Sequence, residues 1–130
     1  MASEPVVLDA SAALAFVRRE RGQDAVGNAL RDGAAISTVN LAEVHSKLRL
    51  AGAPSDRIVA RLKAIGLDVE AFEEADAVAV GDLRPATKSL GLSLADRACL
   101  ALALRLGRPM LTTDRDLAKA GVGVEVVAIR

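Results

Sequence analysis

The sequence predicts an α/β domain in which a central, mostly parallel sheet of about five strands is flanked by helices. Short apolar runs with β-branched residues alternate with helix-like segments along the chain, and this order implies parallel pairing through right-handed crossovers. Of the 130 residues, 52% are hydrophobic but only 2% aromatic, so Ala, Val, Leu and Ile must fill the core. The length fits one domain over residues 1–130.

Strands and helices alternate along the first half of the chain. Runs that are β-branched or alternate in polarity predict strands at residues 6–8, 34–37 and 67–72. Apolar positions at helical spacing predict helices between and around these strands, at residues 12–19, 23–31, 41–50 and 55–65. This half therefore supplies the first three strands of the sheet.

The second half contains two long helical segments and two further strands. Residues 73–88 suit a long helix that an internal glycine weakens and that Pro85 should kink or restart. Ser93 and Asp96 form a capping-box pattern that opens an apolar helix over residues 94–106. Beyond it we expect a strand at 109–112, a short helix at 114–120 and a final strand at 122–129.

The charge balance excludes a strongly basic nucleic-acid-binding surface. Lys and Arg equal Asp and Glu at 17 each, so the chain has no global positive field. Trp and Tyr are absent and only two Phe occur, which leaves no aromatic platform for stacking unpaired bases. A nucleic-acid ligand would therefore have to be held locally, through its backbone and shape.

The single cysteine and the apolar pattern limit the chemistry and the compartment. Cys99 lies in an apolar helical run, which excludes an internal disulfide and a thiolate zinc site and predicts a small core residue. No stretch approaches the roughly 18 uninterrupted apolar residues of a membrane span, and the first residues are acidic rather than basic. We therefore expect a cytoplasmic protein.

Four carboxylates are expected at one edge of the sheet. Asp9 and Asp114 end predicted strands, whereas Glu43 and Asp96 should lie in the first turns of helices. Each one alone is explained by helix capping, with Asn40 as the cap that would precede Glu43 by three residues. In a parallel sheet, however, strand carboxyl ends and the following helix N-termini face the same edge, where ligands bind. Because a cluster of acids is costly unless protons or a divalent cation neutralise it, these hard oxygen ligands predict a site for Mg²⁺ or Mn²⁺.

Four strings resemble the signature stretches of the PIN-domain family, in the family's order. They are VLDASA at residues 7–12, STVNLAEV at 37–44, LSLAD at 92–96 and LTTD at 111–114. Each string is weak evidence alone, but the ordered set is fairly specific, and the resemblance covers essentially the whole chain. In size and in these strings, the sequence is most similar to the VapC-type toxins of bacterial toxin–antitoxin pairs.

The resemblance implies a three-layer fold and a ribonuclease site. By this resemblance the catalytic and metal-binding positions, which hold Mg²⁺ or Mn²⁺, are Asp9, Glu43, Asp96 and Asp114. The implied reaction is endonucleolytic hydrolysis of RNA phosphodiester bonds by metal-activated water, which requires no protein nucleophile. The resemblance also implies two protein partners. These are a cognate VapB-like antitoxin, whose tail enters the acidic groove and inhibits the enzyme, and a second copy of the chain in a homodimer.

Other residues near the four acids have supporting or peripheral places. The resemblance gives Ser11 and Thr113 as small hydroxyl residues that support the carboxylates or a bound water. Asp116 is a possible additional acid, but its spacing on the expected helix should point it elsewhere. His45 is the only histidine and lies two residues after Glu43, so it is expected at a surface or interface rather than in catalysis.

Arginines near the acidic positions could contact RNA phosphates. Arg97 directly follows Asp96 and is the best candidate for an RNA-binding residue. Arg18, Arg19 and Arg21 form a charge run, which is expected to be a solvated face instead.

Other functions compete with the ribonuclease interpretation. A haloacid-dehalogenase-like phosphatase would use Asp9 as its nucleophile, but Ser11 stands where that family generally has a second acid, and the chain is short for that fold. A non-catalytic PIN-like module would bind RNA or protein without cleavage, but it would not need four costly carboxylates. A receiver-like signalling domain would need adjacent acids after the first strand and a well-placed late lysine, and neither is evident.

Overall fold

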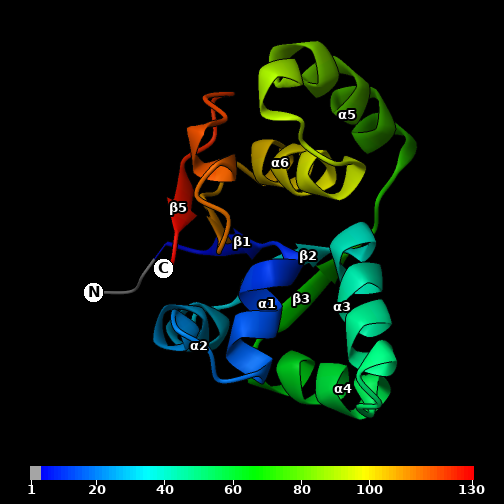
Figure 1. Ribbon diagram of the computed structural model, residues 1–130, viewed down its shortest axis with the longest axis vertical. Coiled ribbons are helices and arrows are strands. Elements are labelled where there is room, and N and C mark those ends of the chain that lie inside the picture. Colours follow the sequence, from blue (N-terminus) through cyan, green and yellow to red (C-terminus); the bar gives the residue numbers. More distant parts are fainter. Residues whose placement is uncertain (1–3) are drawn as a thin grey trace.

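The computed structural model describes residues 4–130 and contains a five-stranded sheet with helices on both faces (Figure 1). The strands lie in the order β3-β2-β1-β4-β5, and each pairs in parallel with its neighbours. Their bounds are Val6–Leu8 for β1, Ala34–Ser37 for β2, Leu67–Glu70 for β3, Met110–Thr112 for β4 and Val126–Ala128 for β5. The parallel α/β fold predicted from the sequence is confirmed.

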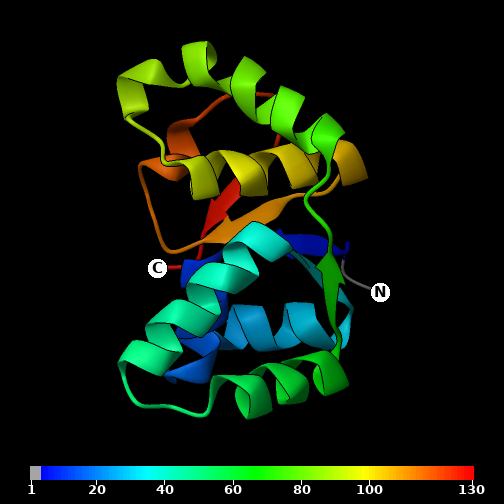
Figure 2. The ribbon, with the colours of Figure 1, turned by 90° about the vertical axis from the view of Figure 1, so that its right-hand side faces the viewer.

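The helices form one layer on each side of the sheet (Figure 2). The first layer contains α1 (Ala10–Val17), α2 (Gln23–Arg31), α3 (Thr38–Leu50) and α4 (Ser55–Ile65). The second contains α5 (Glu74–Ala86), α6 (Leu94–Leu106) and two 3₁₀ helices, η1 (Lys88–Leu90) and η2 (Leu117–Lys119). The sheet is thus the middle of three layers. Within residues 4–130, the helices are too short or too polar to cross a membrane.

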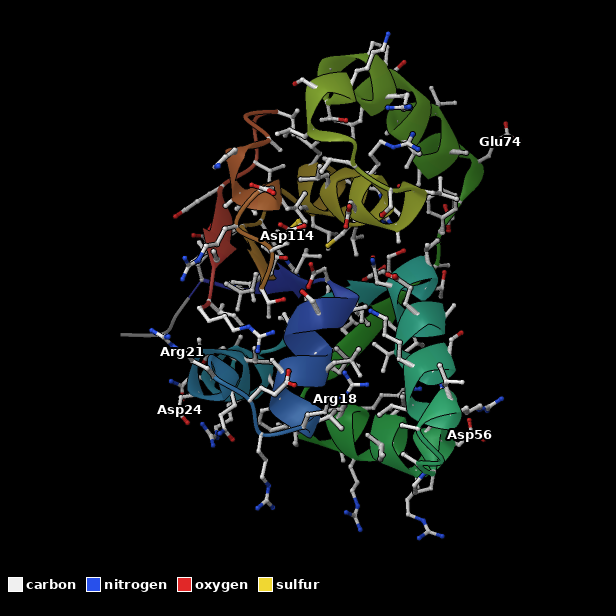
Figure 3. All side chains as sticks on the ribbon, in the orientation of Figure 1. Arg18, Arg21, Asp24, Asp56, Glu74 and Asp114 are labelled. Carbon is white, nitrogen blue, oxygen red and sulfur yellow. The ribbon has the colours of Figure 1, made fainter. Side chains whose placement is uncertain are left out.

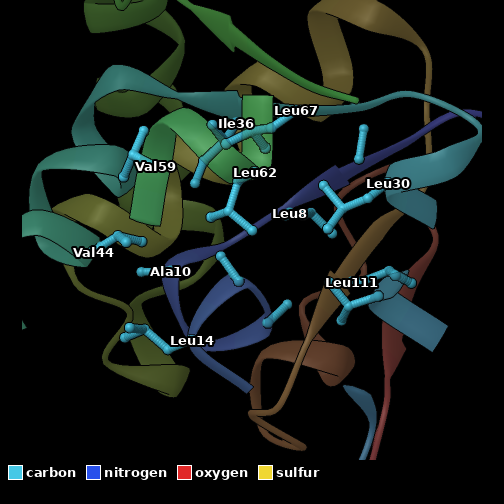
Figure 4. Close-up of a cluster of buried hydrophobic side chains, with 14 of the residues drawn as sticks. Leu8, Ala10, Leu14, Leu30, Ile36, Val44, Val59, Leu62, Leu67 and Leu111 are labelled. Atoms are coloured by element: carbon cyan, nitrogen blue, oxygen red, sulfur yellow. The ribbon is translucent and has the colours of Figure 1, made fainter. Parts of the chain in front are cut away.

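Alternate residues of the central strands supply a separate core to each face. Leu8 and Ile36 belong to the core beneath α1, α2, α3 and α4 (Figure 4). Val7 and Ala35, one residue earlier on the same strands, belong to the core beneath α5 and α6, together with the fully buried Cys99. Because consecutive strand residues point to opposite faces, both faces of these strands must be apolar. The prediction of Cys99 as a core residue is confirmed.

The start of α3 differs from the prediction and moves one of the four acids. Ser37 is the N-cap of α3, and its Oγ accepts a hydrogen bond from the Val39 N–H at 3.2 Å. The helix therefore begins at Thr38, and the prediction that Glu43 lies in the first turn is wrong, since it lies in the second turn. Asn40 is an interior residue of the helix rather than its cap. The strand runs directly into the helix, which leaves no loop for a later cap.

Other boundaries differ mainly in the second half of the chain. Pro85 lies in the last turn of α5, so it accompanies the end of the helix rather than kinking its middle. The segment predicted as a helix over 114–120 forms only the 3₁₀ turn η2. The long final strand predicted over 122–129 shortens to β5, which pairs with the three residues of β4.

The direction in which the chain adds strands reverses between β1 and β4. From β1 the chain adds β2 and β3 on one side, passes through α5 and α6, and then adds β4 and β5 on the other side. In open parallel sheets, ligands bind at such a switch point, outside the carboxyl ends of the strands. Asp9 follows β1 and Asp114 follows β4, so both acids lie at this position.

Candidate functional site

Asp9 is held firmly between β1 and β4. It is 5% exposed and is the N-cap of α1, where its Oδ1 accepts a hydrogen bond from the Ala12 N–H at 2.8 Å. The same oxygen accepts from Ser11 Oγ at 2.7 Å, and Oδ2 accepts from Thr112 Oγ1 at 2.5 Å. Three donors therefore fix both carboxylate oxygens, and two of these donors are neutral hydroxyls.

The end of β4 is joined to Asp9 through hydroxyl groups. The buried Thr112 hydroxyl donates to Asp9 and accepts a hydrogen bond from the Asp114 N–H at 3.0 Å. The Thr113 N–H donates to Ser11 Oγ, also at 3.0 Å. These contacts fix the turn that carries Asp114 relative to the turn that carries Asp9.

Asp114 is exposed and caps the turn that follows it. Its Oδ1 accepts hydrogen bonds from the Asp116 N–H at 2.9 Å and the Leu117 N–H at 3.4 Å. Within residues 4–130, its Oδ2 makes no hydrogen bond. Capping therefore occupies one carboxylate oxygen of Asp114 and leaves the other available.

At the start of α6, Asp96 likewise uses one carboxylate oxygen in capping and leaves the other available. Its Oδ2 accepts from the Ser93 N–H at 3.0 Å, and Ser93 Oγ accepts from the Asp96 N–H at 3.1 Å. The predicted capping box is therefore confirmed. In the described part of the chain, the Oδ1 of Asp96 accepts no hydrogen bond.

Glu43 approaches this region from α3, next to a polar link between two helices. Glu43 is half-buried and has no ion pair or side-chain hydrogen bond among the described residues. Asn40, one turn earlier and 1% exposed, donates its Nδ2 to the Ala95 carbonyl at 3.1 Å. That contact holds α3 against the first turn of α6, where Asp96 lies.

Negative charges accumulate around the buried end of the site. Burial raises the pKa of Asp9, the negative charge of Asp96 raises it further, and the hydrogen bonds from Thr112, Ser11 and the Ala12 N–H oppose this rise. Burial also raises the pKa of the Cys99 thiol well above its usual value, and the charges of Asp9, Asp96 and Glu43 add to that effect. The negative charges of Asp9, Asp96 and Glu43 thus all raise the pKa of the same buried residue, Cys99.

The carboxylate oxygens are suitable ligands for a hard divalent cation, although their side chains do not form a complete metal-binding cluster. In residues 4–130, no three Asp, Glu, His or Cys side chains are grouped closely enough to hold one metal ion. None of the ion pairs of these residues includes Asp9, Glu43, Asp96 or Asp114. Four acids without cationic partners fit the chemistry of Mg²⁺ or Mn²⁺, which prefer carboxylate oxygens.

The family to which the chain belongs follows from its sequence and its fold together. The sequence matches the PIN domain over residues 6–123. The chain belongs to the PIN-domain family. No curated protein sequence matches it. The expected family and fold class are therefore confirmed.

Solved structures with this fold include several toxin–antitoxin complexes. A toxin–antitoxin complex from Klebsiella pneumoniae has a TM-score of 0.76 and 20% identity, with 96% of this chain and 98% of that chain covered. A DNA-bound VapBC from Salmonella typhimurium has a TM-score of 0.74 and 17% identity, with coverages of 98% and 100%. VapBC-5 from Mycobacterium tuberculosis has a TM-score of 0.65 and 25% identity, with coverages of 98% and 99%.

Three further residues considered in the sequence lie at the margin of this PIN domain's acidic site or outside it. The Arg97 guanidinium donates from one Nη to the Val80 carbonyl of α5 at 3.0 Å, so its side chain links α6 to α5. Asp116 is exposed and pairs with Lys119 at 3.4 Å. His45 Nδ1 lies 2.8 Å from Ser55 Oγ, between α3 and α4.

Two residues near Asp9 and Asp96 were not predicted from the sequence. Thr113 was expected to supply the supporting hydroxyl, but the hydroxyl that reaches Asp9 is that of Thr112, and Thr113 contributes its N–H. Strand alternation could have indicated Thr112. It lies two residues after Met110 and Asp9 lies two residues after Val7, so both follow strand positions that face α5 and α6. Asn40 was considered only as a possible cap, and no local signal shows its contact with Ala95, 55 residues away.

Proposed function

We propose that this PIN domain is a metal-dependent endoribonuclease and the toxin of a toxin–antitoxin pair. The observation that carries the proposal is the fixed position of Asp9 at the switch point, with Asp96 and Glu43 acting on the same region and Asp114 linked to it through Thr112. The site residues would be Asp9, Glu43, Asp96 and Asp114. Ser11 and Thr112 would support them.

The chain's own residues would supply one fixed metal ligand, Asp9, and several adjustable ones. Asp9 is oriented by its three donors, so it can bind a cation with little reorganisation. Asp96 and Asp114 each keep one oxygen that caps the backbone and one that is available. When bound, Mg²⁺ or Mn²⁺ would supply Lewis-acid chemistry, which lowers the pKa of a water and offsets charge on the phosphate.

The proposed partners rest on the comparisons as well as on the site. Three of the similar structures are described as VapBC, two of them bound to DNA, and another as a toxin–antitoxin complex. We therefore propose a VapB-like antitoxin that inhibits the enzyme by covering the acidic edge. We also propose a homodimer, as the family resemblance implies. RNA is proposed as the substrate because VapC-type toxins, which the sequence resembles, are ribonucleases.

The proposal is tested by incubating the purified protein with structured cellular RNA and Mg²⁺ or Mn²⁺. We expect cleavage that EDTA abolishes and that Asp96→Asn reduces strongly. Asp82→Asn is the matched control, because Asp82 is an exposed acid of α5 without an ion pair among the described residues. Cleavage that persists in EDTA and in Asp96→Asn would contradict the proposed mechanism.

One observation favours a non-catalytic PIN module as the second candidate. The described side chains form no finished three-ligand cluster, as a domain that only binds RNA or protein would allow. Such a module would bind RNA with the same affinity in Asp96→Asn and would show no metal-dependent cleavage. A phosphatase that uses Asp9 as nucleophile is disfavoured, because Ser11 stands where that family generally has a second acid.

A further inference from the structure

A hollow lined by three arginines includes Asp114 and so lies at one end of the acidic site. Its volume is about 410 Å³, and it is a shallow depression that opens to solvent. Its lining consists of Arg21, Thr113, Asp114, Arg115, Asp116 and Arg130. In Figure 3, Asp114 lies between α6 and α1, and Arg21 lies beside α2.

The three arginines come from three separate segments that specific contacts hold together. Arg21 precedes Gly22, whose φ is +99° and where an added Cβ would lie 2.8 Å from the Ile129 side chain. The Ile129 N–H in turn donates to the Thr112 carbonyl at 2.9 Å. The segment after β5 is therefore packed against both the α1–α2 loop and the end of β4.

Two polar contacts complete this assembly. Arg130 Nη1 pairs with Glu20 Oε1 at 3.3 Å, which joins the last segment to the α1–α2 loop a second time. Arg115 donates its Nε to the Arg130 carbonyl at 3.1 Å. These contacts fix the backbone segments that carry the three exposed arginines.

The guanidinium groups in this hollow are only partly used by the protein itself. Among residues 4–130, Arg21 makes no ion pair and no side-chain hydrogen bond, and Arg115 uses only its Nε. Of the two acids in the lining, Asp116 is paired with Lys119, and Asp114 caps the turn with one oxygen. The hollow therefore offers unused, forked donors in a chain whose overall charge is zero.

We propose that this arginine hollow binds the phosphate backbone of the RNA strand next to the bond that is cleaved. The inference rests on the proposed ribonuclease function and adds the surface that positions its substrate. The acidic edge repels phosphates, so a substrate needs cationic contacts close by, and Arg21 and Arg115 supply them within the same hollow as Asp114. The scarcity of aromatic side chains agrees with recognition through the backbone.

The test measures binding separately from cleavage. A fluorescein-labelled, single-stranded RNA of mixed sequence is titrated in EDTA with the wild type, Arg21→Ala, and the Arg21→Ala/Arg115→Ala double variant, over a series of salt concentrations. Arg18→Ala is the matched control, because Arg18 is an exposed arginine at the end of α1 that does not line the hollow. Thermal unfolding confirms that each variant is folded. Arg21→Glu provides a second, charge-reversing variant of the arginine that makes no side-chain hydrogen bond or ion pair among the described residues.

We expect the double variant to bind RNA at least about tenfold more weakly. Its salt dependence should be shallower, by about 0.7 in the slope of log K against log salt for each lost phosphate contact. Arg18→Ala should match the wild type. In Mg²⁺, the double variant should raise KM and leave kcat nearly unchanged.

Other outcomes separate the two proposals. Wild-type affinity and slope in both the double variant and Arg21→Glu would overturn the arginine hollow while leaving metal-dependent cleavage intact. If these variants bound duplex DNA more weakly but bound RNA as tightly as the wild type, the arginine hollow would also be overturned. If the wild type cleaves no RNA, the proposed function fails, whatever the arginine variants do.

Discussion

Asp9 and Glu43 lie in the same acidic region, but the protein holds them very differently. Asp9 is buried and accepts three hydrogen bonds from α1 and β4, whereas Glu43 is half-buried on α3 and accepts none from the described residues. Fixing a buried carboxylate costs free energy of folding, which the surrounding donors only partly offset. In the proposed enzyme, Asp9 would therefore define the position of the site, and the other acids would adjust to the ligand.

The largest expected effect separates the fixed acid from an acid outside the site. Asp9→Asn keeps the size of the side chain but removes its charge, so we expect RNA cleavage to fall by about 10³-fold, equivalent to about 4 kcal/mol. Initial rates at saturating RNA in Mg²⁺ measure this, with Asp82→Asn as control. A loss of less than tenfold would show that Asp9 is not a metal ligand.

Removal of the Thr112 hydroxyl tests what fixes Asp9. Thr112→Val is nearly isosteric, but it leaves Asp9 Oδ2 without its donor and the Asp114 N–H without its acceptor. We expect the free energy of unfolding to decrease by about 2 kcal/mol, together with reduced cleavage. Thr113→Val is the matched control, because only its N–H contacts Ser11. Equal stability losses in the two variants, measured by urea unfolding, would contradict this account.

The pKa of Asp9 gives the fixed region a dependence on pH. Because burial raises this pKa in the folded state, the folded protein retains a proton that the unfolded chain loses from about pH 4 upward. The free energy of unfolding should therefore fall as the pH rises from that point through the folded pKa. Asp9→Asn lacks this titration, so its free energy of unfolding relative to the wild type should increase as the pH rises from about 4 toward neutral.

Urea unfolding of both proteins in EDTA, from pH 4 to pH 8, measures this difference. Stability curves that stay parallel over the whole range would show that the carboxylate carries no such cost. Added Mg²⁺ should then stabilise the wild type by about 2.7 kcal/mol at a hundred times its Kd, and Asp9→Asn much less. Equal stabilisation of both proteins would place the metal elsewhere.

The same contrast explains what the sequence could predict. Asp9, Asp96 and Asp114 each follow a strand or open a helix, so local patterns predicted their capping roles, which are confirmed. The parallel order of the strands also followed from the alternation of apolar runs. Local patterns failed at Glu43. Both Ser37 and Asn40 could cap the helix that carries it, and the helix uses the earlier residue, Ser37.

Contacts between distant segments could not be predicted in this way. The Thr112 hydroxyl meets Asp9 across 103 positions, and the Asn40 amide meets Ala95 across 55. Arg21 is exposed, as its charge run predicts, but the packing of Gly22 on Ile129 that places it in the arginine hollow could not be predicted. Such contacts depend on which strands become neighbours, which a single sequence does not specify.

The smallest expected change in stability concerns Glu43, the adjustable acid. Glu43→Gln removes a charge that no hydrogen bond of the described residues holds, so the free energy of unfolding in EDTA should change by less than about 0.5 kcal/mol. RNA cleavage in Mg²⁺ should nevertheless fall by about 10²-fold, because a ligand of the cation is lost. Urea unfolding and initial rates on the same preparation measure the two effects. A stability change as large as that of Thr112→Val would show that Glu43 is part of the fixed framework, and the division between the two kinds of acid would then be wrong.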